Sequence, residues 1–292
     1  MVKHDKRFQY TVHIIMIILC LFCILPFVLL VSSSLTADST LVKYGYSFWP
    51  KEVDLEAYEY LVFGSTSILR GYGISILVTV TGTVLSLMLT TLFAYPLSRK
   101  NMPGRNMFSF FIFFTMLFNG GLVPTYIMWT QVFHIKNTLF ALIVPGLLMN
   151  AFNVIMMRTY LTTNIPEEVI EAAKADGAGE FRILLQIVVP MAKPILATLT
   201  LLIGLGYWND WLNGLYYITD DSLFSIQVLL KKMLDNVEMI RNAASSGAAA
   251  MQMPSTSIRM AVAVIGALPI LMVYPFFQKY FVKGIIVGAV KG

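Results

Sequence analysis

Few residues of this sequence have the types and spacing that catalysis or metal binding requires. Cys20 and Cys23 form a CxxC pair, but they lie inside an apolar run that holds no further ligand. A metal or redox site needs polar, accessible surroundings, so we interpret the pair as thiols within a membrane span. The histidines His4, His13 and His134 are far apart and match no metal motif. The sequence therefore predicts neither a catalytic site nor a metal site.

A nucleotide site of the phosphate-loop kind is also missing from the sequence. There is no G-x-x-x-x-G-K-[ST] motif, and no glycine is followed directly by lysine. If ATP powers this protein, the ATPase is another polypeptide. We therefore expect this chain to bind no cofactor, with ATP and Mg²⁺ held by that partner.

The longest charged and patterned stretch between two apolar segments is residues 164–194. Pro166 and the two glutamates after it are typical of a helix start, because proline there loses no hydrogen bond and carboxylates favour the positive end of the helix dipole. Asn164 or Thr163 is expected to cap this helix. Gly177 is expected to end it.

A second helix is predicted after Gly177. Its apolar residues recur at helical spacing, at Phe181, Leu184, Leu185 and Val188. Pro190 and Pro194 are expected to limit this helix. A helix, a glycine hinge and a helix on the cytoplasmic side of a membrane protein predict an element that docks on a partner.

This stretch resembles the EAA loop of ABC importer permeases. The resemblance is carried by Glu171, Ala172, Ala173, Asp176, Gly177, Ala178, Phe181, Ile187 and Pro190. In that family the loop forms coupling helices that dock in a cleft of the ATPase subunit, so the resemblance implies ATPase coupling here. The alternative is an ordinary amphipathic hairpin, in which Glu171 and Asp176 pair weakly with Lys174 or Arg182.

Further stretches resemble the maltose-type sugar-importer group of these permeases. Residues 274–292 resemble the group's C-terminal tail, which reaches the ATPase dimer interface, so Lys291 and Gly292 are also assigned to ATPase coupling. The run from Trp208 to Asp210 fits the fifth span of that group. Residues 120–126 and 257–260 resemble a subgroup associated with complex oligosaccharides and polysaccharide fragments.

A second suggestive cluster consists of five consecutive residues: Tyr207, Trp208, Asn209, Asp210 and Trp211. Sugars stack their CH faces on aromatic rings and bond their hydroxyls to amides and carboxylates, and a carboxylate in or near a span is costly unless it is used. We assign this cluster to the substrate pathway. The alternative is an aromatic belt at the membrane surface, with Asp210 solvated. Weaker candidates are Asn119, Tyr126 and Asn153.

The elements that must position these residues are membrane helices. Hydrophobic residues make up 57% of the 292 and charged residues only 13%, whereas a soluble domain carries about 25% charged residues. The net charge of +5 comes from basic residues scattered among loops, which is a poor match to nucleic-acid binding. Six apolar spans are predicted, at about 12–31, 71–97, 107–129, 138–157, 195–217 and 258–281. The second span is rich in Gly, Ser and Thr, which suits close packing of helices in lipid. The run Asn119-Gly120-Gly121 and Pro124 are expected to break the third span near its outer end.

The expected fold is therefore all-α, a single transmembrane domain over residues 1–292. Residues 32–70 and 218–256 form the outer segments, 158–194 the inner loop, and both termini are cytoplasmic. Residues 32–70 are expected to be folded. Within 218–256, apolar residues at helical spacing from Ile226 to Val237 predict an amphipathic helix, and residues 243–250 are expected to be loose. Of the 21 Lys and Arg residues, 13 fall in the predicted inner segments or, for Lys279, at the inner end of the sixth span, a modest excess in the direction of the positive-inside rule. A signal peptide is the alternative for the first span, but its apolar core of about 20 residues is too long.

The resemblance covers nearly the whole chain and implies the permease fold of type I ABC importers, in a bacterial cell membrane. It implies four further partners: a second permease, two ATPases and an external solute-binding protein. The implied function is import of oligosaccharides or polysaccharide fragments by a subunit that is not itself an enzyme. The alternatives are an ABC importer of a non-sugar solute, an ion-coupled transporter, which needs membrane-embedded acids or paired repeats, and a membrane enzyme.

Overall fold

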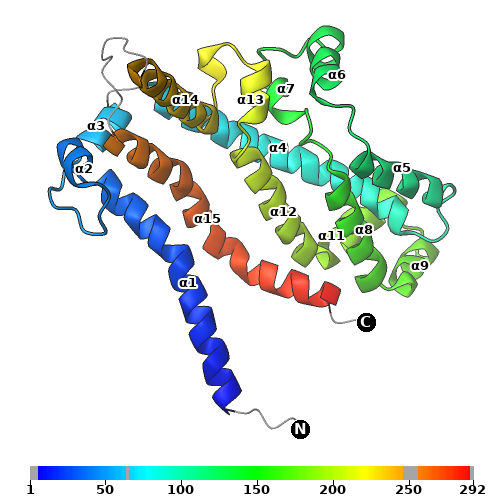
Figure 1. The fold of residues 1–292 in the computed structure, drawn as a ribbon. Helices are drawn as coiled ribbons and strands as arrows, with labels where there is room; N and C mark the ends of the chain where they lie inside the picture. Colours follow the sequence, from blue (N-terminus) through cyan, green and yellow to red (C-terminus); the bar gives the residue numbers. More distant parts are fainter. Residues whose placement is uncertain (1–5, 64–65, 246–255, 290–292) are drawn as a thin grey trace. The chain divides into compact units, whose positions relative to one another are not determined.

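The computed structural model describes residues 6–63, 66–245 and 256–289, which are helical apart from turns, loops and one isolated antiparallel bridge between Thr36 and Val53 (Figure 1). Three long helices in this part of the chain are long and apolar enough to cross a membrane. They are α1 (Lys6–Ser34), α4 (Thr66–Ser98) and α15 (Thr256–Ala289). They contain the predicted first, second and sixth spans.

Two further candidate spans are bent pairs of helices. In the first, α5 (Arg105–Leu117) is followed by α6 (Leu122–Ile127) and the π-helical turn η1 (Met128–Val132). The helix axis bends by 112° between α5 and the α6–η1 part. The predicted break at Asn119-Gly120-Gly121 is confirmed. Gly121 has a φ of +84°, a left-handed value that glycine adopts without strain.

The second bent pair carries the inner loop into the predicted fifth span. It joins α10 (Glu180–Ile183), the π-helical turn η2 (Leu184–Val188) and α11 (Val189–Met191) to α12 (Lys193–Trp208), at an angle of 83°. The helix restarts at Lys193 and Pro194, as expected for proline in a first turn. A short helix α13 (Leu212–Tyr217) completes residues 195–217 after a break at 209–211.

The predicted fourth span is not one helix. Residues 138–157 contain α7 (Phe140–Ile143), then an irregular stretch, then the start of α8 (Ala151–Asn164). Pro145 lacks a backbone N–H and Gly146 has a φ of +72°, so a helix cannot continue through them. The Asn150 side chain caps α8, its Oδ1 accepting from the Phe152 N–H at 2.9 Å. The count of six spans therefore stays a prediction.

The chain divides into two compact units, residues 1–69 with 230–269, and residues 70–229 with 270–292. In the first unit, the predicted folding of the segment after α1 is confirmed. It contains α2 (Asp38–Tyr44) and α3 (Glu56–Phe63), held by a hydrogen bond between the Ser34 and Tyr58 hydroxyls at 2.7 Å. Asp38 Oδ1 accepts from the Thr256 and Ser257 N–H groups and so caps α15.

Small residues let helices of the second unit approach closely, as the Gly, Ser and Thr content of the second span predicted. A Cβ atom at Gly82 of α4 would lie 2.5 Å from the Tyr207 ring of α12. Gly214 of α13 meets Val228 of α14 (Ile226–Ser245) in the same way. The helix predicted within residues 218–256 is confirmed by α14, and the stretch predicted to be loose, 243–250, lies mostly outside the described residues.

The C-terminal part of the chain is helical as far as Ala289, so α15 runs through the predicted sixth span and through most of residues 282–292. The inner position expected for residues 282–292 stays a prediction. This part of the sequence has no proline, and glycine inside a helix costs only about 1 kcal/mol, so nothing stops the helix there. Lys291 and Gly292 lie outside the described residues.

Candidate functional site

The first helix of the charged stretch 164–194 is α9 (Glu167–Ala175), as predicted, and residues 158–164 of the inner loop continue α8. Its predicted cap was wrong, because Asn164 is the last residue of α8 and Pro166 occupies the N-cap position with an extended backbone. Pro166 fixes its own φ near −60°, which ends α8 and sets the start of α9. The side chains of Asn164 and Thr163 instead donate to carbonyls of α8.

Gly177 ends α9 in a left-handed conformation, with a φ of +79°. The Ala178 N–H donates to the Ala173 carbonyl and the Gly177 N–H to the Lys174 carbonyl, both at 3.0 Å, which closes the C-terminus of the helix. A Cβ atom at Gly177 would meet nothing within 4 Å. The requirement for glycine therefore comes from the backbone alone, and the predicted break is confirmed.

The apolar face predicted for the second helix is only partly buried. Leu184 and Val188 are buried, whereas Phe181 and Leu185 are 74% and 64% exposed. Phe181 precedes the π-helical turn η2 and Leu185 lies within it, so the regular helical spacing on which the prediction rested does not hold through these residues.

The residues assigned to coupling lie on the open side of this element. Glu171, Ala172 and Asp176 are exposed, and Ala173 and Ala178 are half-buried. Among the described residues, Glu171 and Asp176 form no ion pair. Lys174 and Arg182, their suggested partners, bond instead to Glu180 and Gln186. The local pairing expected for an ordinary hairpin was therefore wrong.

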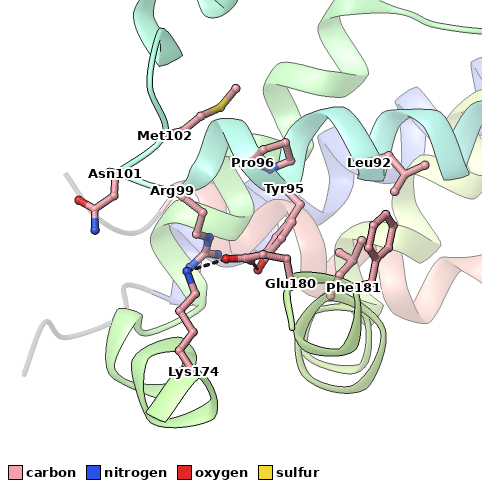
Figure 2. A pocket seen from close by; sticks show the side chains of 10 residues that line it. Leu92, Tyr95, Pro96, Arg99, Asn101, Met102, Lys174, Glu180 and Phe181 are labelled. Atoms are coloured by element: carbon pink, nitrogen blue, oxygen red, sulfur yellow. Dashed lines mark hydrogen bonds and ion pairs between the residues drawn. The ribbon is translucent and has the colours of Figure 1, made fainter. Parts of the chain in front are cut away.

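Glu180, the first residue of α10, links the inner loop to the end of α4. Its Oε2 accepts from the Tyr95 hydroxyl at 2.6 Å, and its Oε1 lies 2.6 Å from Lys174 Nζ of α9. Arg99 lies over the Tyr95 ring, 5.2 Å from the centroid. Figure 2 shows these side chains around a cavity of about 350 Å³ that Phe181 also lines. One carboxylate thus joins α9, α10 and α4.

A second link joins Glu167, at the start of α9, to Lys100, two residues beyond the end of α4. Lys100 Nζ lies 2.8 Å from Glu167 Oε2. The hydrogen bond from Lys100 lowers the pKa of the Glu167 carboxyl group, and the same bond raises the pKa of Lys100. Lys100 is exposed and Glu167 is half-buried, so solvent screens the pair, and it orients the loop more than it stabilises the fold.

The end of α4 is also bonded to two other helices. The Leu97 carbonyl accepts from Arg105 Nε at 3.0 Å and from Arg158 Nε at 3.1 Å. Arg105 opens α5 and Arg158 belongs to α8. Cations at the negative end of a helix dipole are favourable. The C-terminus of α4 is therefore the point where the inner loop, α5 and α8 are held together.

Sequence reasoning missed the residues that make these links: Tyr95, Arg99, Lys100, Glu167 and Glu180. Their types gave a partial signal, since basic residues close the second span and acidic residues open each loop helix. The pairing itself could not be predicted, because Tyr95 and Glu180 are separated by 85 positions.

The structure gives several residues of the second cluster roles within the fold. Tyr207 is buried and its hydroxyl donates to the Ile143 carbonyl at 2.9 Å. Trp208 is buried, with its ring 6.3 Å from that of Tyr72. Asp210 Oδ1 accepts from the Leu212 and Asn213 N–H groups, both at 3.2 Å, and so caps α13.

Asn209 is exposed and Trp211 is half-buried, both at the break between α12 and α13. The weaker candidates have local contacts. Asn119 Oδ1 accepts from the Gly121 N–H at 2.9 Å, and the Tyr126 ring stacks on Tyr217 at 5.9 Å. Asn153 is buried in α8. Contact of these residues with a substrate stays a prediction.

The chain resembles known transport proteins over almost its full length. Residues 87–287 match the family described as "Binding-protein-dependent transport system inner membrane component". The chain is 37% identical over 272 residues to Protein LplC of Bacillus subtilis (strain 168), covering 92% of this chain and 90% of that protein. It is 34% identical over 288 residues to the polygalacturonan/rhamnogalacturonan transport system permease protein YtcP of the same strain, covering 99% of each.

A solved structure agrees with these relatives. A chain from the crystal structure of a bacterial ABC transporter involved in the import of the acidic polysaccharide alginate matches with a TM-score of 0.81 and 30% identity. The match covers 96% of the present chain and 99% of the other. The family match, the relatives and the fold agree, and the chain therefore belongs to the family of inner membrane components of binding-protein-dependent transport systems.

Proposed function

We propose that this chain is the permease subunit of an ATP-driven importer of oligosaccharides or polysaccharide fragments, and that it forms half of the translocation path. The observation that carries the proposal is the exposed α9–Gly177–α10 element, tied to the end of α4 through Glu180 and Glu167. End-to-end similarity to permeases named for polygalacturonan and arabinooligosaccharide transport supports the substrate class.

The geometry suggests how the chain would transmit force. A partner that grips the exposed face of α9 would pull on Lys174 and Glu167, and through their bonds on Glu180, Tyr95 and Lys100 at the end of α4. Helices are stiff along their axes, so this movement would tilt α4 as a unit. Alternating access to the path would follow, with ATP and Mg²⁺ bound by the ATPase subunits.

The assembly we propose contains a second permease, two ATPases and an external solute-binding protein. Docking of the ATPases at Glu171, Ala172, Ala173 and Asp176 would place α9 in the cytoplasm. The N- and C-termini would then also be cytoplasmic if the chain crosses the membrane six times. The binding protein would meet the outer segments, residues 32–70 and 218–256.

The test is purification of the tagged chain from its own membrane, followed by an ATPase assay of the co-purifying proteins. We expect a second permease and an ATPase to co-purify, and Gly177→Pro to release the ATPase while the chain stays inserted. Solute specificity is then measured by uptake of size-defined oligosaccharides into proteoliposomes. The proposal would be contradicted if the chain purified without partner subunits and transported solute in response to an ion gradient. Uptake of a non-sugar solute would contradict only the proposed substrate class.

A further inference from the structure

Residues 43–51 of the first unit, here named the aromatic loop, expose four aromatic side chains close together in the sequence. Trp49 is 83% exposed, and Tyr44, Tyr46 and Phe48 are also exposed. Exposed apolar side chains that cluster in this way mark a surface that meets a partner or a membrane. The loop lies outside all the residues assigned to coupling or to the substrate pathway, but within the outer segment 32–70 that we propose to meet the binding protein.

The structure fixes the level of this loop relative to α1. The apolar run Val12–Val31 contains 20 residues, which at about 1.5 Å per residue matches a hydrocarbon layer of about 30 Å. Ser32, the next residue, donates its Oγ to the Ser47 carbonyl at 2.8 Å. The Ala37 N–H donates to the Glu52 carbonyl at 3.1 Å and holds the end of the loop. The aromatic loop thus lies where the hydrocarbon-length stretch of α1 ends (Figure 1).

The charges of the loop have one sign. Lys51 Nζ lies 4.0 Å from the centroid of the Tyr44 ring and Lys43 Nζ 5.1 Å from it. Residues 39–51 contain no acidic side chain, and the nearby Glu52 carboxylate accepts a hydrogen bond from Thr40 Oγ1 at 2.8 Å. Tyrosine, tryptophan and lysine together are the side chains that favour the headgroup level of a bilayer, with apolar parts inward and polar ends in water.

We propose that the aromatic loop anchors the C-terminal end of α1 in the headgroup layer of the membrane, with its rings at the hydrocarbon boundary and Lys43 and Lys51 on lipid phosphates. A lipid surface is favoured over a protein partner because the loop is bonded to the last turn of a membrane-spanning helix. The inference rests on α1 crossing the membrane and needs nothing about the transported solute.

The test uses the full-length protein in lipid nanodiscs and measures Trp49 fluorescence as the difference between wild type and Trp49→Phe. Lipids brominated near the headgroup should quench this difference signal more strongly than lipids brominated near the chain end, and aqueous iodide should quench it weakly. As a control, the signal lost in Trp208→Phe, from a buried ring, should respond to neither quencher.

Two results would overturn the anchor. Strong quenching by iodide without quenching by lipid would place Trp49 in water, and no quenching by either would show that protein covers it. The role of the cations is tested in nanodiscs of phosphatidylglycerol, where Lys43→Gln/Lys51→Gln should reduce lipid quenching of Trp49. In phosphatidylcholine the double substitution should change quenching less. Equal effects in both lipids would contradict the proposed contact of Lys43 and Lys51 with lipid phosphates. Neither readout uses ATP or solute, so failure here is distinct from failure of the proposed function.

Discussion

At the scale of single residues, we expect the hydroxyl group of Tyr95 to contribute to the coupling between solute transport and ATP hydrolysis. Tyr95→Phe removes only the hydrogen bond to Glu180, worth about 1 kcal/mol for a partly solvated charged acceptor. We expect the variant to insert normally but to transport less solute per ATP hydrolysed. The measurement is the ratio of uptake to phosphate release in proteoliposomes. Tyr10→Phe, at an exposed tyrosine, is the matched control, and an unchanged ratio in Tyr95→Phe would show that the bond carries no force.

Gly177 and Gly179 offer a comparison within one loop. A Cβ atom added at either position would meet nothing within 4 Å, but only Gly177 has a left-handed φ. Gly177→Ala should therefore cost about 1–2 kcal/mol of local strain. Gly179→Ala adds no such strain, because its φ is −72°, and should cost only the smaller preference for glycine over alanine at the N-cap of α10. ATPase activity retained on the purified permease should fall in the first variant only. Equal losses in both would mean that the glycines are needed for contact with the partner rather than for backbone conformation.

The Lys100–Glu167 pair predicts a pH dependence. Because Lys100 lowers the pKa of Glu167, the contribution of the pair is complete above the unfolded carboxyl pKa and is lost as the pH falls through the folded value. Acidification should therefore weaken coupling more in wild type than in Lys100→Gln. The exchanged variant Lys100→Glu/Glu167→Lys should recover coupling that Lys100→Glu loses. Identical pH profiles of wild type and Lys100→Gln would contradict this role.

Whether the role of a residue could be predicted from the sequence depends largely on how far apart in the chain its interaction partners are. Gly177 was predicted because a helix end is a local property that the next few residues determine. The hydrogen bond from Tyr207 to the Ile143 carbonyl was not predicted, because a tyrosine that bonds a distant carbonyl and one that contacts sugar have the same neighbours in sequence. The bonds of Asp210 are local, to the N–H groups of residues 212 and 213, and they were missed because the carboxylate was assigned to the substrate pathway.

At the scale of helices, α4 and α12 are packed through a glycine. Gly82→Ala would force a methyl group into the Tyr207 ring and should cost about 1–3 kcal/mol, which lowers the melting temperature. Gly73→Ala lies on the same helix with nothing within 4 Å and should gain about 0.5–1 kcal/mol from helix propensity. Thermal unfolding followed by fluorescence in detergent compares the two. A stabilised Gly82→Ala would refute the close packing.

The sequence predicted where long apolar helices lie, because twenty apolar residues have few alternatives in a membrane. It placed the break at Asn119–Gly121 correctly because the glycines are adjacent. It missed the interruption of residues 138–157, where Pro145 and Gly146 lie inside an otherwise apolar stretch. The π-helical turn η2 has no local sequence signal, so the departure of residues 184–188 from regular helical spacing could not be predicted.

At the scale of the whole molecule, the path of the chain between α6 and α9 decides the number of crossings. In a Cys20→Ser/Cys23→Ser background, Lys136→Cys and Thr162→Cys replace exposed residues on either side of α7. If residues 138–164 cross the membrane, an impermeant maleimide should label the first in intact cells and the second only after permeabilisation. Labelling of both from one side would exclude a crossing between them and with it the six-span topology.

The family could be reached from the sequence alone because its coupling motif and C-terminal stretch are contiguous. The full-length relatives and the alginate-importer structure then showed it independently. The residues that touch solute could not be reached in the same way. In the importer that we propose, the path is shared by two permeases and lined from both, so one chain would supply only part of that lining.

The carbonyl oxygen of Leu97 has a mechanical consequence. A carbonyl oxygen has two lone pairs, and here both are directed to guanidinium groups, one at the start of α5 and one on α8. The helices α5 and α8 are thus both bonded to one atom at the end of α4. Neither arginine can move away from that atom without breaking its hydrogen bond, unless the end of α4 moves with it. Movement of this corner should therefore come in steps, with both bonds kept or one lost, and not as a gradual bend of the three helices.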